Sequence, residues 1–257
     1  MFYLAFEKRL YIVENPQRKC YIEKKRFFMD KAYISECATQ IGVDLTPSQL
    51  EKLCGYQEAV VESNKAFNLT AITEDKDFAV KHIQDSLAGA SLLTSGAKLL
   101  DIGAGAGFPS MPIAIAREDV FVTALDSTAK KMAFLSSAAK TLDVKNLKTI
   151  SARAEDKKEL FGTFDYVTAR AVSSLRILLE LAIPYLKVGG KFIAYKTDES
   201  ELETSQNAEK TLNAKHIETK SLTLADGEKR ALLVFEKTAP TPKQYPRQYG
   251  VIKKKPL

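Results

Sequence analysis

The chain has 257 residues, of which 45% are hydrophobic and 27% charged, and its formal net charge at pH 7 is +6. This composition is ordinary for a soluble globular protein, and the length fits one α/β domain with a smaller appended element. No apolar run reaches the roughly 20 residues of a membrane span, and Glu7, Lys8 and Arg9 interrupt the apolar start that a signal peptide would need, so we expect a cytoplasmic protein without a membrane partner.

The positive charge is concentrated at the two ends of the chain. Residues 1–31 hold 8 Lys and Arg against 4 Asp and Glu, and residues 237–257 hold 6 against none, while the stretch between them holds 24 against 28. A basic tail suits a polyanion such as RNA, although a charge run can also be a solvated surface. The cysteines are odd in number and the two histidines lie far apart, so we expect neither a disulfide framework nor a metal site.

Residues 1–28 differ from the rest of the chain. They mix aromatic residues with Lys and Arg clusters, show no helical or strand period, and end just before Met29 and a clear helical pattern. One hypothesis is that Met29 is the biological start and that residues 1–28 are an upstream translated extension. The alternative is a basic, loosely ordered arm. N-terminal sequencing of the native protein distinguishes the two, because an intact Met1 end contradicts the first.

A helical cap is predicted for residues 29–95, beginning with apolar residues at helical spacing. Residues 46–49, Thr-Pro-Ser-Gln, form a capping box with proline at the first helical position. A helix therefore begins there, and its pattern ends near Asn64. Residues 78–93 predict a further helix that is interrupted by Gly89.

A strand, a glycine-rich loop and a helix start follow the cap. Residues 98–102 form an apolar run typical of a buried strand, and Gly103, Gly105 and Gly107 follow at alternate positions. Glycine tolerates positive φ and lets a ligand lie against the backbone, and Pro109 suits the first turn of a helix. This stretch predicts a site for a nucleotide-type cofactor.

The glycine spacing indicates which cofactor binds there. A dinucleotide fingerprint needs a third glycine where Phe108 stands, and the Gly-Lys-Ser/Thr of a Walker A loop is absent. Asp101, two residues before the first glycine, completes a pattern that resembles the S-adenosylmethionine loop of Rossmann-like methyltransferases. In that resemblance the loop wraps the methionine part of the cofactor, and the helix N-terminus faces its carboxylate. A glycine-rich turn without a ligand is the alternative.

From residue 96 onward strands and helices alternate. This alternation predicts βαβ units and a mainly parallel, doubly wound sheet, that is, an α/β Rossmann-like domain over residues 96–237. Residues 238–257 are then a basic, Pro-rich and irregular tail. Strands are predicted at 98–102, 120–125, 147–151, 164–168, 191–195 and 231–235, with a further candidate at 215–224, and helices at 110–117, 128–142, 174–186 and 199–212.

Ligands of such sheets lie at the carboxyl ends of the strands, so the residues after each strand are candidates. After the second strand, Asp126 stands where an acid accepts hydrogen bonds from a ribose, and it could also cap the next helix. After the third strand, Arg153, Ala154 and Glu155 stand where a methyltransferase would contact adenine. A surface role for Glu155 is the alternative.

The residue after the fourth strand indicates which atom could accept the methyl group. Arg170 stands there instead of the Asp/Asn-Pro-Pro-aromatic motif of adenine amino methyltransferases, and no cysteine nucleophile for pyrimidine C5 chemistry lies in the sheet domain. A buried arginine needs an anion or acceptor, or an ion pair, for instance with Glu155. A ring nitrogen such as guanine N7 has a free lone pair and no proton to lose, so alignment alone suffices. Arg170 could then hold guanine O6, a phosphate or the cofactor carboxylate.

Seven short motifs occur together: Asn-Leu-Thr at 68–70, His-Ile-Gln-Asp-Ser-Leu at 82–87, the loop at 101–109, Asp-Ser at 126–127, Arg-Ala-Glu at 153–155, Ala-Arg-Ala at 169–171 and the ending Lys-Lys-Lys-Pro-Leu. Over about residues 31–257 this combination resembles the glucose-inhibited division protein B family. Proteins of that family are bacterial methyltransferases that modify N7 of guanine 527 in the 16S rRNA of the small ribosomal subunit. The resemblance implies S-adenosylmethionine as cofactor and the small subunit as partner, and we expect a monomer.

The resemblance also implies site residues. Matched position by position, the cofactor contacts of the family fall on Gly103, Phe108, Ala154, Glu155 and Arg170. Together with the residues argued above, the expected cofactor site consists of Asp101, Gly103, Gly105, Gly107, Phe108, Asp126, Ala154, Glu155 and Arg170. The expected catalytic residues are Arg170 and Asn68. The residues expected to contact the substrate are Asn68, Arg153 and Arg230, with Lys229 as the alternative to Arg230.

The chain departs from the family pattern at two positions. Ser110 stands where many members have glycine, and Gln84 replaces a common leucine; both changes leave the interpretation standing. His82 belongs to a motif, but N7 chemistry needs no base, so we expect a capping or packing role. We accordingly expect His82→Ala to reduce stability more than methyl transfer.

Other functions stay open on the sequence alone. One is a methyltransferase for another acceptor, and a second is a noncatalytic RNA-binding assembly factor that keeps the cofactor fold. An NAD oxidoreductase is disfavoured by Phe108 and by the lack of a recognisable catalytic pair.

Overall fold

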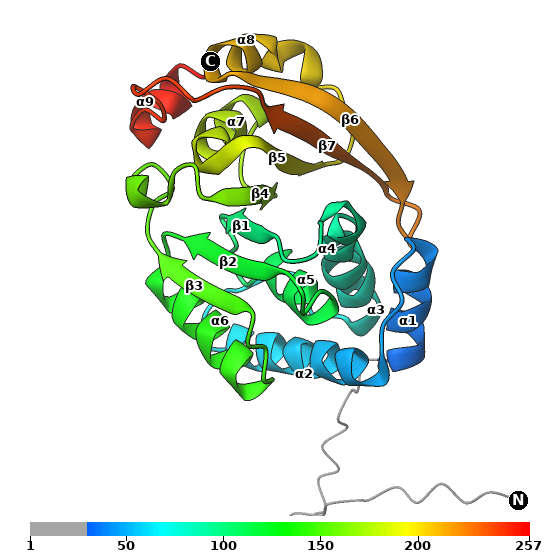
Figure 1. Cartoon of the computed structure of the whole chain (residues 1–257). Helices are drawn as coiled ribbons and strands as arrows, with labels where there is room; N and C mark the ends of the chain where they lie inside the picture. Colours follow the sequence, from blue (N-terminus) through cyan, green and yellow to red (C-terminus); the bar gives the residue numbers. More distant parts are fainter. Residues whose placement is uncertain (1–29) are drawn as a thin grey trace, which may run out of the picture.

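The computed structural model describes residues 30–257, and residues 1–29, with both hypotheses about Met29, lie outside the described part. A seven-stranded sheet crosses the molecule and carries helices on both faces (Figure 1). Within residues 30–257, none of the helices is both long and apolar enough to span a membrane.

The sheet has the strand order β3-β2-β1-β4-β5-β7-β6, and β7 runs antiparallel to both of its neighbours. The predicted doubly wound α/β fold is therefore confirmed, including the candidate strand at 215–224. The order reverses between β1 and β4, which is where open α/β sheets form a ligand crevice. The strands are β1 (Lys98–Ile102), β2 (Phe121–Asp126), β3 (Leu147–Ser151), β4 (Phe164–Arg170), β5 (Leu186–Lys196), β6 (Ala214–Thr223) and β7 (Lys229–Lys237).

Two helices precede the sheet, α1 (Lys31–Gln40) and α2 (Pro47–Asn64). The predicted capping box opens α2: the Gln49 backbone N–H donates to Thr46 Oγ1 at 3.3 Å, and the Thr46 N–H donates to Gln49 Oε1 at 2.9 Å. These two bonds satisfy backbone donors that the first turn of a helix leaves free.

The helix expected at 78–93 is divided into four short pieces. They are α3 (Asp75–Phe78), the π-helix η1 (Ala79–Gln84), α4 (Asp85–Leu87) and the 3₁₀-helix η2 (Ala90–Leu92). The predicted break at Gly89 lies between the last two, where a Cβ would collide with the Tyr195 hydroxyl. The wide turn of a π-helix often occurs at a functional site, and η1 leads to the cavity described below.

Further helices cover the two faces of the sheet. They are α5 (Ser110–Ala116), α6 (Ala129–Thr141), η3 (Lys158–Leu160), α7 (Leu175–Ala182), η4 (Ile183–Tyr185), α8 (Leu202–Leu212) and α9 (Tyr249–Lys254). On one face, side chains of α1, α2, α5 and α6 form a continuous hydrophobic core with β1 and β2. On the other face, α7, α8 and α9 pack against β4, β5 and β7. The predicted cap thus shares its core with the sheet, and its boundary at residue 95 stays a proposal.

The C-terminal tail packs against α7. Arg247 holds the fully buried Glu180 of α7: its Nε donates to Oε1 at 2.8 Å and its Nη2 to Oε2 at 2.6 Å. Ile252 of α9 is also fully buried. The expectation of an irregular tail is therefore wrong for α9, because burial of Ile252 and the buried ion pair stabilise a helix that the Pro-rich sequence does not indicate.

Candidate functional site

A cavity of about 360 Å³ lies where β1, β2 and β4 end. Its walls come from the glycine loop after β1, the end of β2, the start of α6, the end of β4 and parts of η1 and the segment before it. We call it the carboxyl-edge cavity, defined by Gly105, Phe108, Asp126, Lys131 and Arg170. It occupies the crevice expected from the reversal of strand order.

The three loop glycines all have positive φ, but they serve different purposes. A Cβ on Gly103 would lie 2.6 Å from Val172, and one on Gly107 would lie 2.5 Å from both Leu135 and the Tyr56 hydroxyl. A Cβ on Gly105 would come no closer than 3.8 Å to any atom outside its chain neighbours. Gly103 and Gly107 therefore allow close packing behind the loop, whereas Gly105 keeps the backbone open toward the cavity.

Asp126 links the glycine loop to α6. Its Oδ2 accepts from the Gly105 N–H at 3.0 Å, and its Oδ1 accepts from the Thr128 N–H at 2.7 Å. The bond from Thr128, the residue before α6, agrees in part with the helix-capping function considered from sequence, whereas the ribose contact stays a prediction. Both carboxylate oxygens keep a lone pair for a ligand hydroxyl, and the side chain lines the cavity.

Asp101 lies behind the loop and is fully buried. Its Oδ2 accepts from the Ser110 N–H at 3.1 Å, and its Oδ1 accepts from the Thr168 hydroxyl at 3.3 Å. Burial raises the pKa of this carboxyl to about 7. Asp101 therefore holds the start of α5 against β4, and it is absent from the described lining of the cavity.

Arg170 occupies the centre of a buried polar network. Its Nη1 donates to the Lys81 carbonyl at 2.7 Å and to Asp85 Oδ2 at 2.8 Å, and its Cζ lies 5.6 Å from the centre of the Phe108 ring. The ion pair considered from sequence is therefore formed with Asp85, and Glu155 does not take part. Among residues 30–257, Nε of Arg170 has no hydrogen-bond partner although it is buried, so this N–H can serve a ligand.

A second arginine stabilises the same carboxylate. Arg230 Nε lies 3.2 Å from Asp85 Oδ1, and its Nη2 lies 2.8 Å from Glu228 Oε2. Asp85 is 3% exposed, so two guanidinium groups balance one buried charge and one partly exposed acid. Arg230 stands behind Arg170 and is outside the described lining of the cavity.

His82 connects Arg170 to the cavity wall. Its ring stacks on Phe108 with the centroids 4.2 Å apart and the planes 5° from parallel. Burial, with the nearby Arg170 charge, lowers the pKa of His82 to about 3. The imidazole is therefore neutral, and because a guanidinium can only donate, His82 Nδ1 accepts from Arg170 Nη2 at 3.1 Å. This assignment places the ring proton on Nε2.

The proton on His82 Nε2 fixes the direction of the Thr70 hydroxyl. Nε2 lies 2.7 Å from Thr70 Oγ1, and the Ile72 N–H donates to the same oxygen at 3.0 Å. Both lone pairs of Oγ1 are then occupied, so the Thr70 O–H can only donate. Thr70 lines the cavity, and Asn64 Oδ1 fixes its backbone by accepting from the Thr70 N–H at 3.1 Å.

Several residues expected at the site lie away from this cavity. Asn68 is exposed on the loop beside Thr70, and Arg153 places its guanidinium 5.9 Å from the Tyr249 ring of the tail. Ala154 and Glu155 are buried in the turn after β3. Their functions stay predictions, as do those of the expected residues that do line the cavity, which are Gly103, Gly105, Phe108, Asp126 and Arg170.

The sequence analysis missed two polar residues that line the cavity and one that supports it. Thr70 belongs to the Asn-Leu-Thr motif, so a signal for it existed, whereas Lys131 of α6 carries none. Asp85 lies within the 82–87 motif, but its pairing with Arg170 depends on the fold. Across residues 30–257, no group of three or more His, Cys, Asp and Glu side chains could hold a metal ion.

The lining residues suit a ligand that carries both charge signs and hydroxyl groups. Lys131 and the free N–H of Arg170 can meet an anionic group, and Asp126 can accept from hydroxyls. Phe108 presents an apolar ring between them. His82 is unsuited to act as a base, since both of its ring nitrogens are engaged and its pKa is about 3.

Comparison with known proteins shows extended similarity. Residues 49–233 match the family described as rRNA small subunit methyltransferase G. Ribosomal RNA small subunit methyltransferase G of Streptococcus pyogenes serotype M12 is 44% identical over 224 residues, which is 84% of this chain and 94% of that protein. The protein of the same name from Leuconostoc citreum is 39% identical over 236 residues, which is 88% of this chain and 98% of that protein.

A solved structure supports the fold. M. jannaschii TYW2 in complex with AdoMet is 18% identical and has a TM-score of 0.51, over 61% of this chain and 76% of that one. At this level of identity the likeness concerns the fold alone. It agrees with the predicted Rossmann-like class I architecture, with helices added before the sheet.

Proposed function

The chain belongs to the rRNA small subunit methyltransferase G family, and from that premise we propose that it transfers the methyl group of S-adenosylmethionine to N7 of a guanine in 16S rRNA. Guanine 527, the target in the resembling family, is the proposed acceptor. The observation that carries the proposal is the carboxyl-edge cavity, which is lined by hydrogen-bond donors and by a histidine whose low pKa and engaged ring nitrogens make it unsuited to act as a base.

The cavity residues fit S-adenosylmethionine. Asp126 keeps lone pairs for the ribose hydroxyls, Gly105 leaves the backbone open, and Lys131 suits the carboxylate. When bound, the cofactor supplies an electrophilic methyl group next to a positive sulfur. Ala154 and Glu155 are proposed to face the adenine, and Asp101 and Gly107 to hold the loop from behind.

The acceptor atom follows from what the side chains can do. Guanine N7 carries a free lone pair, so its methylation removes no proton from that atom and requires only alignment with the methyl group. His82 has a pKa of about 3, and its Nδ1 lone pair accepts from Arg170. This supports direct in-line transfer without a general base.

Thr70 and Arg170 can hold the guanine without covering N7. Guanine presents O6 and N7 as neighbouring acceptors on one edge. Thr70 and Arg170 both line the cavity, and their O–H and Nε–H are the donors proposed to reach the guanine. If these donors engage O6 or a phosphate, N7 stays free to react. Asn68, exposed on the loop beside Thr70, is a proposed further contact to the guanine or its neighbour.

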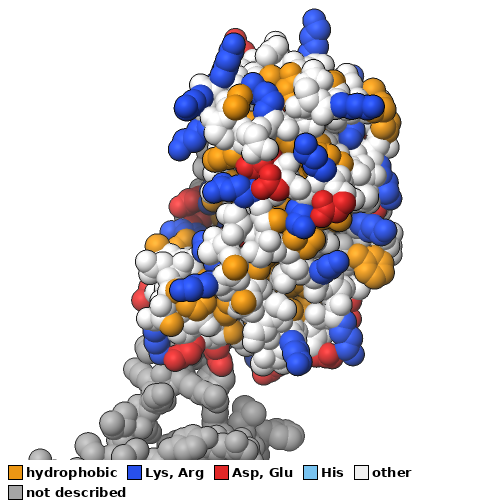
Figure 2. Space-filling view, turned by 90° about the vertical axis from the view of Figure 1, so that its left-hand side faces the viewer, with side chains coloured by type: hydrophobic (Ala, Val, Ile, Leu, Met, Phe, Trp, Pro, Cys, Tyr) orange, Lys and Arg blue, Asp and Glu red, His pale blue; other side chains and the backbone are white. Residues whose placement is uncertain are grey.

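An RNA substrate needs a surface beyond the cavity. Figure 2 shows Lys and Arg side chains spread over one face of the molecule among fewer Asp and Glu side chains. Arg153 is exposed beside α9, and Arg230 is partly exposed near the end of η1; both are proposed RNA contacts. Such a surface suits the phosphates of a folded RNA.

The test is transfer of labelled methyl from S-adenosylmethionine to small ribosomal subunits from a strain that lacks this activity, followed by nucleoside analysis. We expect the label in 16S rRNA as 7-methylguanosine, at one position. Label in another nucleoside would reject the N7 acceptor. Absence of transfer to RNA, with cofactor binding measured on the same sample, would favour another acceptor or a noncatalytic RNA-binding role.

A further inference from the structure

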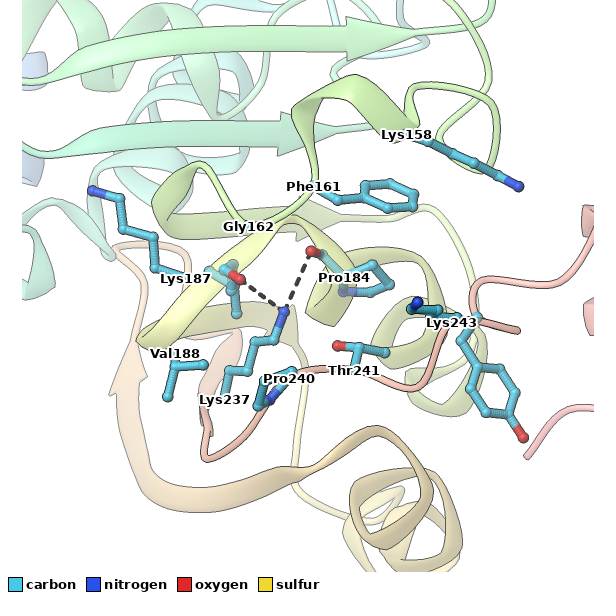
Figure 3. Close-up of a pocket in the computed structure, with 12 residues that line it drawn as sticks. Lys158, Phe161, Gly162, Pro184, Lys187, Val188, Lys237, Pro240, Thr241 and Lys243 are labelled. Atoms are coloured by element: carbon cyan, nitrogen blue, oxygen red, sulfur yellow. Dashed lines mark hydrogen bonds between the residues drawn. The ribbon is translucent and has the colours of Figure 1, made fainter.

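A second cavity, of about 510 Å³, lies at the opposite edge of the same sheet. It is lined by the loop before β4, the start of β5, the end of β7 and residues 240–245 of the tail (Figure 3). We call it the amino-edge pocket, defined by Lys158, Lys187, Lys237, Thr241 and Lys243.

Lys237 is a buried cation at the base of this pocket. It is 5% exposed, and its Nζ donates to the Leu186 carbonyl at 2.8 Å and to the Pro184 carbonyl at 3.4 Å (Figure 3). Among the described residues no carboxylate lies within ion-pair distance of it. An ammonium has three donors, so one donor and the full charge are left for a ligand. Burial lowers the pKa of Lys237, as expected for a cation with little access to water.

Thr241 supplies a second polar group without a partner. Its Oγ1 is buried and makes no hydrogen bond within residues 30–257. In Figure 3 this oxygen turns toward the side of the pocket where the Lys237 amine lies. Native proteins rarely leave a buried hydroxyl unsatisfied, so an ammonium and a hydroxyl on neighbouring walls point to a ligand that accepts hydrogen bonds and carries negative charge.

The rim adds further positive charge. Lys158, Lys187 and Lys243 line the pocket, and the described lining contains no Asp or Glu. Lys187 pairs with Asp165 at 2.6 Å outside the lining, whereas Lys158 and Lys243 form no ion pair with any described residue. Three of the four lysines are therefore unneutralised, and the potential in the pocket favours an anion.

The remaining walls are apolar and partly aromatic. Phe161 and Pro184 form one side, and Pro240 closes the pocket from the tail (Figure 3). Val188 is 57% exposed at the opening. An aromatic or proline surface beside cationic groups suits a flat base attached to a phosphate, and the volume lies in the range of small-molecule sites.

We propose that the amino-edge pocket binds a nucleotide unit, with its phosphate at Lys237 Nζ and Thr241 Oγ1 and its base against Phe161. The unit can come from a free nucleoside monophosphate or from a strand of RNA. The site itself is independent of the proposed methyl transfer, and only the RNA source rests on that function.

Binding to the full chain tests the site with two probes, AMP and a mixed-sequence single-stranded RNA hexamer. The variants are Lys237→Met, Thr241→Val and Lys243→Ala. The control is Lys140→Ala, which removes one exposed lysine at the end of α6. We expect Lys237→Met to weaken binding by about tenfold or more, Thr241→Val and Lys243→Ala by about threefold to tenfold, and the control by less than about twofold.

The two probes distinguish a free nucleotide from an RNA strand as the ligand of this pocket. Competition between AMP and the hexamer, both weakened by the variants, assigns the site to RNA; AMP binding alone assigns it to a free nucleotide. Unchanged binding of both probes in correctly folded Thr241→Val and Lys243→Ala proteins overturns the proposal, even if Lys237→Met fails to fold. Methyl transfer by the unsubstituted chain is measured separately, so a chain that binds AMP through Lys237 but methylates no RNA disproves the proposed function and leaves this site standing.

Discussion

The two edges of the sheet carry cavities of about 360 and 510 Å³ that differ in the charge of the side chains around them. At the carboxyl edge, the partly buried Arg170 and Arg230 both meet the buried Asp85, and Asp126 lines the same cavity. At the amino edge, Lys237 meets only backbone carbonyls, and the described lining holds no acid. The first cavity is close to charge balance and the second is strongly positive.

This difference indicates how each cavity selects a ligand. A cofactor that carries a carboxylate, an ammonium and a sulfonium gains little from a strong net field, so fixed donors and acceptors must recognise it. A phosphate gains most from uncompensated cations. The network around Arg170 therefore fixes the positions of hydrogen-bonding groups, whereas the lysines of the amino-edge pocket attract an anionic ligand. Changes at the first edge should affect turnover, and changes at the second should affect affinity.

The largest expected effect is that of Arg170→Ala on methyl transfer. Loss of the guanidinium removes a donor to the ligand and releases His82 Nδ1, so the direction of the Thr70 hydroxyl is also lost. We expect the turnover number to fall by at least about 100-fold. The fold should persist, since Arg230 still balances Asp85.

The matched control for this prediction is Lys243→Ala, which removes one cation at the other edge. It should keep the turnover number at saturating RNA, because Lys243 lies far from the reacting atoms. Wild-type turnover in a folded Arg170→Ala protein would remove that residue from the site. Equal losses of turnover in the two variants would abolish the proposed distinction between the edges.

The glycine loop gives a second test, measured as stability. Gly107→Ala places a Cβ 2.5 Å from Leu135 and the Tyr56 hydroxyl at a φ of +90°, and we expect a loss of about 2–4 kcal/mol in the free energy of unfolding. Gly105→Ala faces open space at a φ of +57°, so about 1 kcal/mol of backbone strain is expected.

Cofactor binding separates the two glycine variants further. Gly105→Ala should reduce cofactor affinity, because its methyl group enters the surface that the ligand covers, and urea unfolding with titration calorimetry measures both quantities. A Gly107→Ala protein as stable as Gly105→Ala would show that the packing behind the loop is more adaptable than the contacts indicate.

The carboxyl edge should also control how stability depends on pH. The pKa of His82 falls from 6.5 to about 3, so between these values only the unfolded chain binds the proton, and stability rises with pH. The pKa of Asp101 rises from 3.8 to about 7, so between these values only the folded chain keeps the proton, and stability falls with pH. Across most of this range the two slopes oppose each other.

Single variants should expose the two slopes. In Asp101→Asn only the contribution of His82 remains, so the free energy of unfolding should rise between pH 4 and 6.5. In His82→Gln only the contribution of Asp101 remains, so the free energy of unfolding should fall over the same range. Each slope is at most about 1.4 kcal/mol per pH unit, and urea unfolding at several pH values measures it. Thr241→Val is the control at the other edge, because it removes no titrating group. Slopes of the same sign in both variants would contradict the assignment.

The fold was largely predictable because its signals are local. A strand that is covered by helices on both faces has apolar residues at consecutive positions, so it can be recognised from a short apolar run. All the predicted strands occur. The exception in extent is β5, predicted as 191–195 and observed as Leu186–Lys196, since Gly189 and Gly190 break the apolar run although Leu186 already pairs with Phe164 of β4 across a register shift. The capping box of α2 was predictable for the same reason, because four adjacent residues determine it.

The site was only partly predictable because some of the residues that contact each other there are far apart in the sequence and are brought together only by the fold. The glycine loop and Asp126 follow from strand ends, and they do line the cavity. Asp85 could not be chosen over Glu155 as the partner of Arg170, since that pairing depends on how the start of α4 lies against the end of β4. The amino-edge pocket depends in the same way on the tail, which the Arg247 pair with Glu180 holds against α7.

The smallest and most specific prediction concerns Thr70. In Thr70→Val the hydroxyl that donates into the cavity is replaced by a methyl group of similar size, and His82 Nε2 and the Ile72 N–H lose their acceptor. Loss of one donor to guanine should reduce kcat/KM for RNA by about tenfold, while cofactor affinity changes little. Thr70→Ser keeps the hydroxyl and should retain activity within about threefold. Equal activity of the Val and Ser variants would show that transfer depends neither on the donor to guanine nor on the bond from His82 to this hydroxyl, which would leave Arg170 to hold the base.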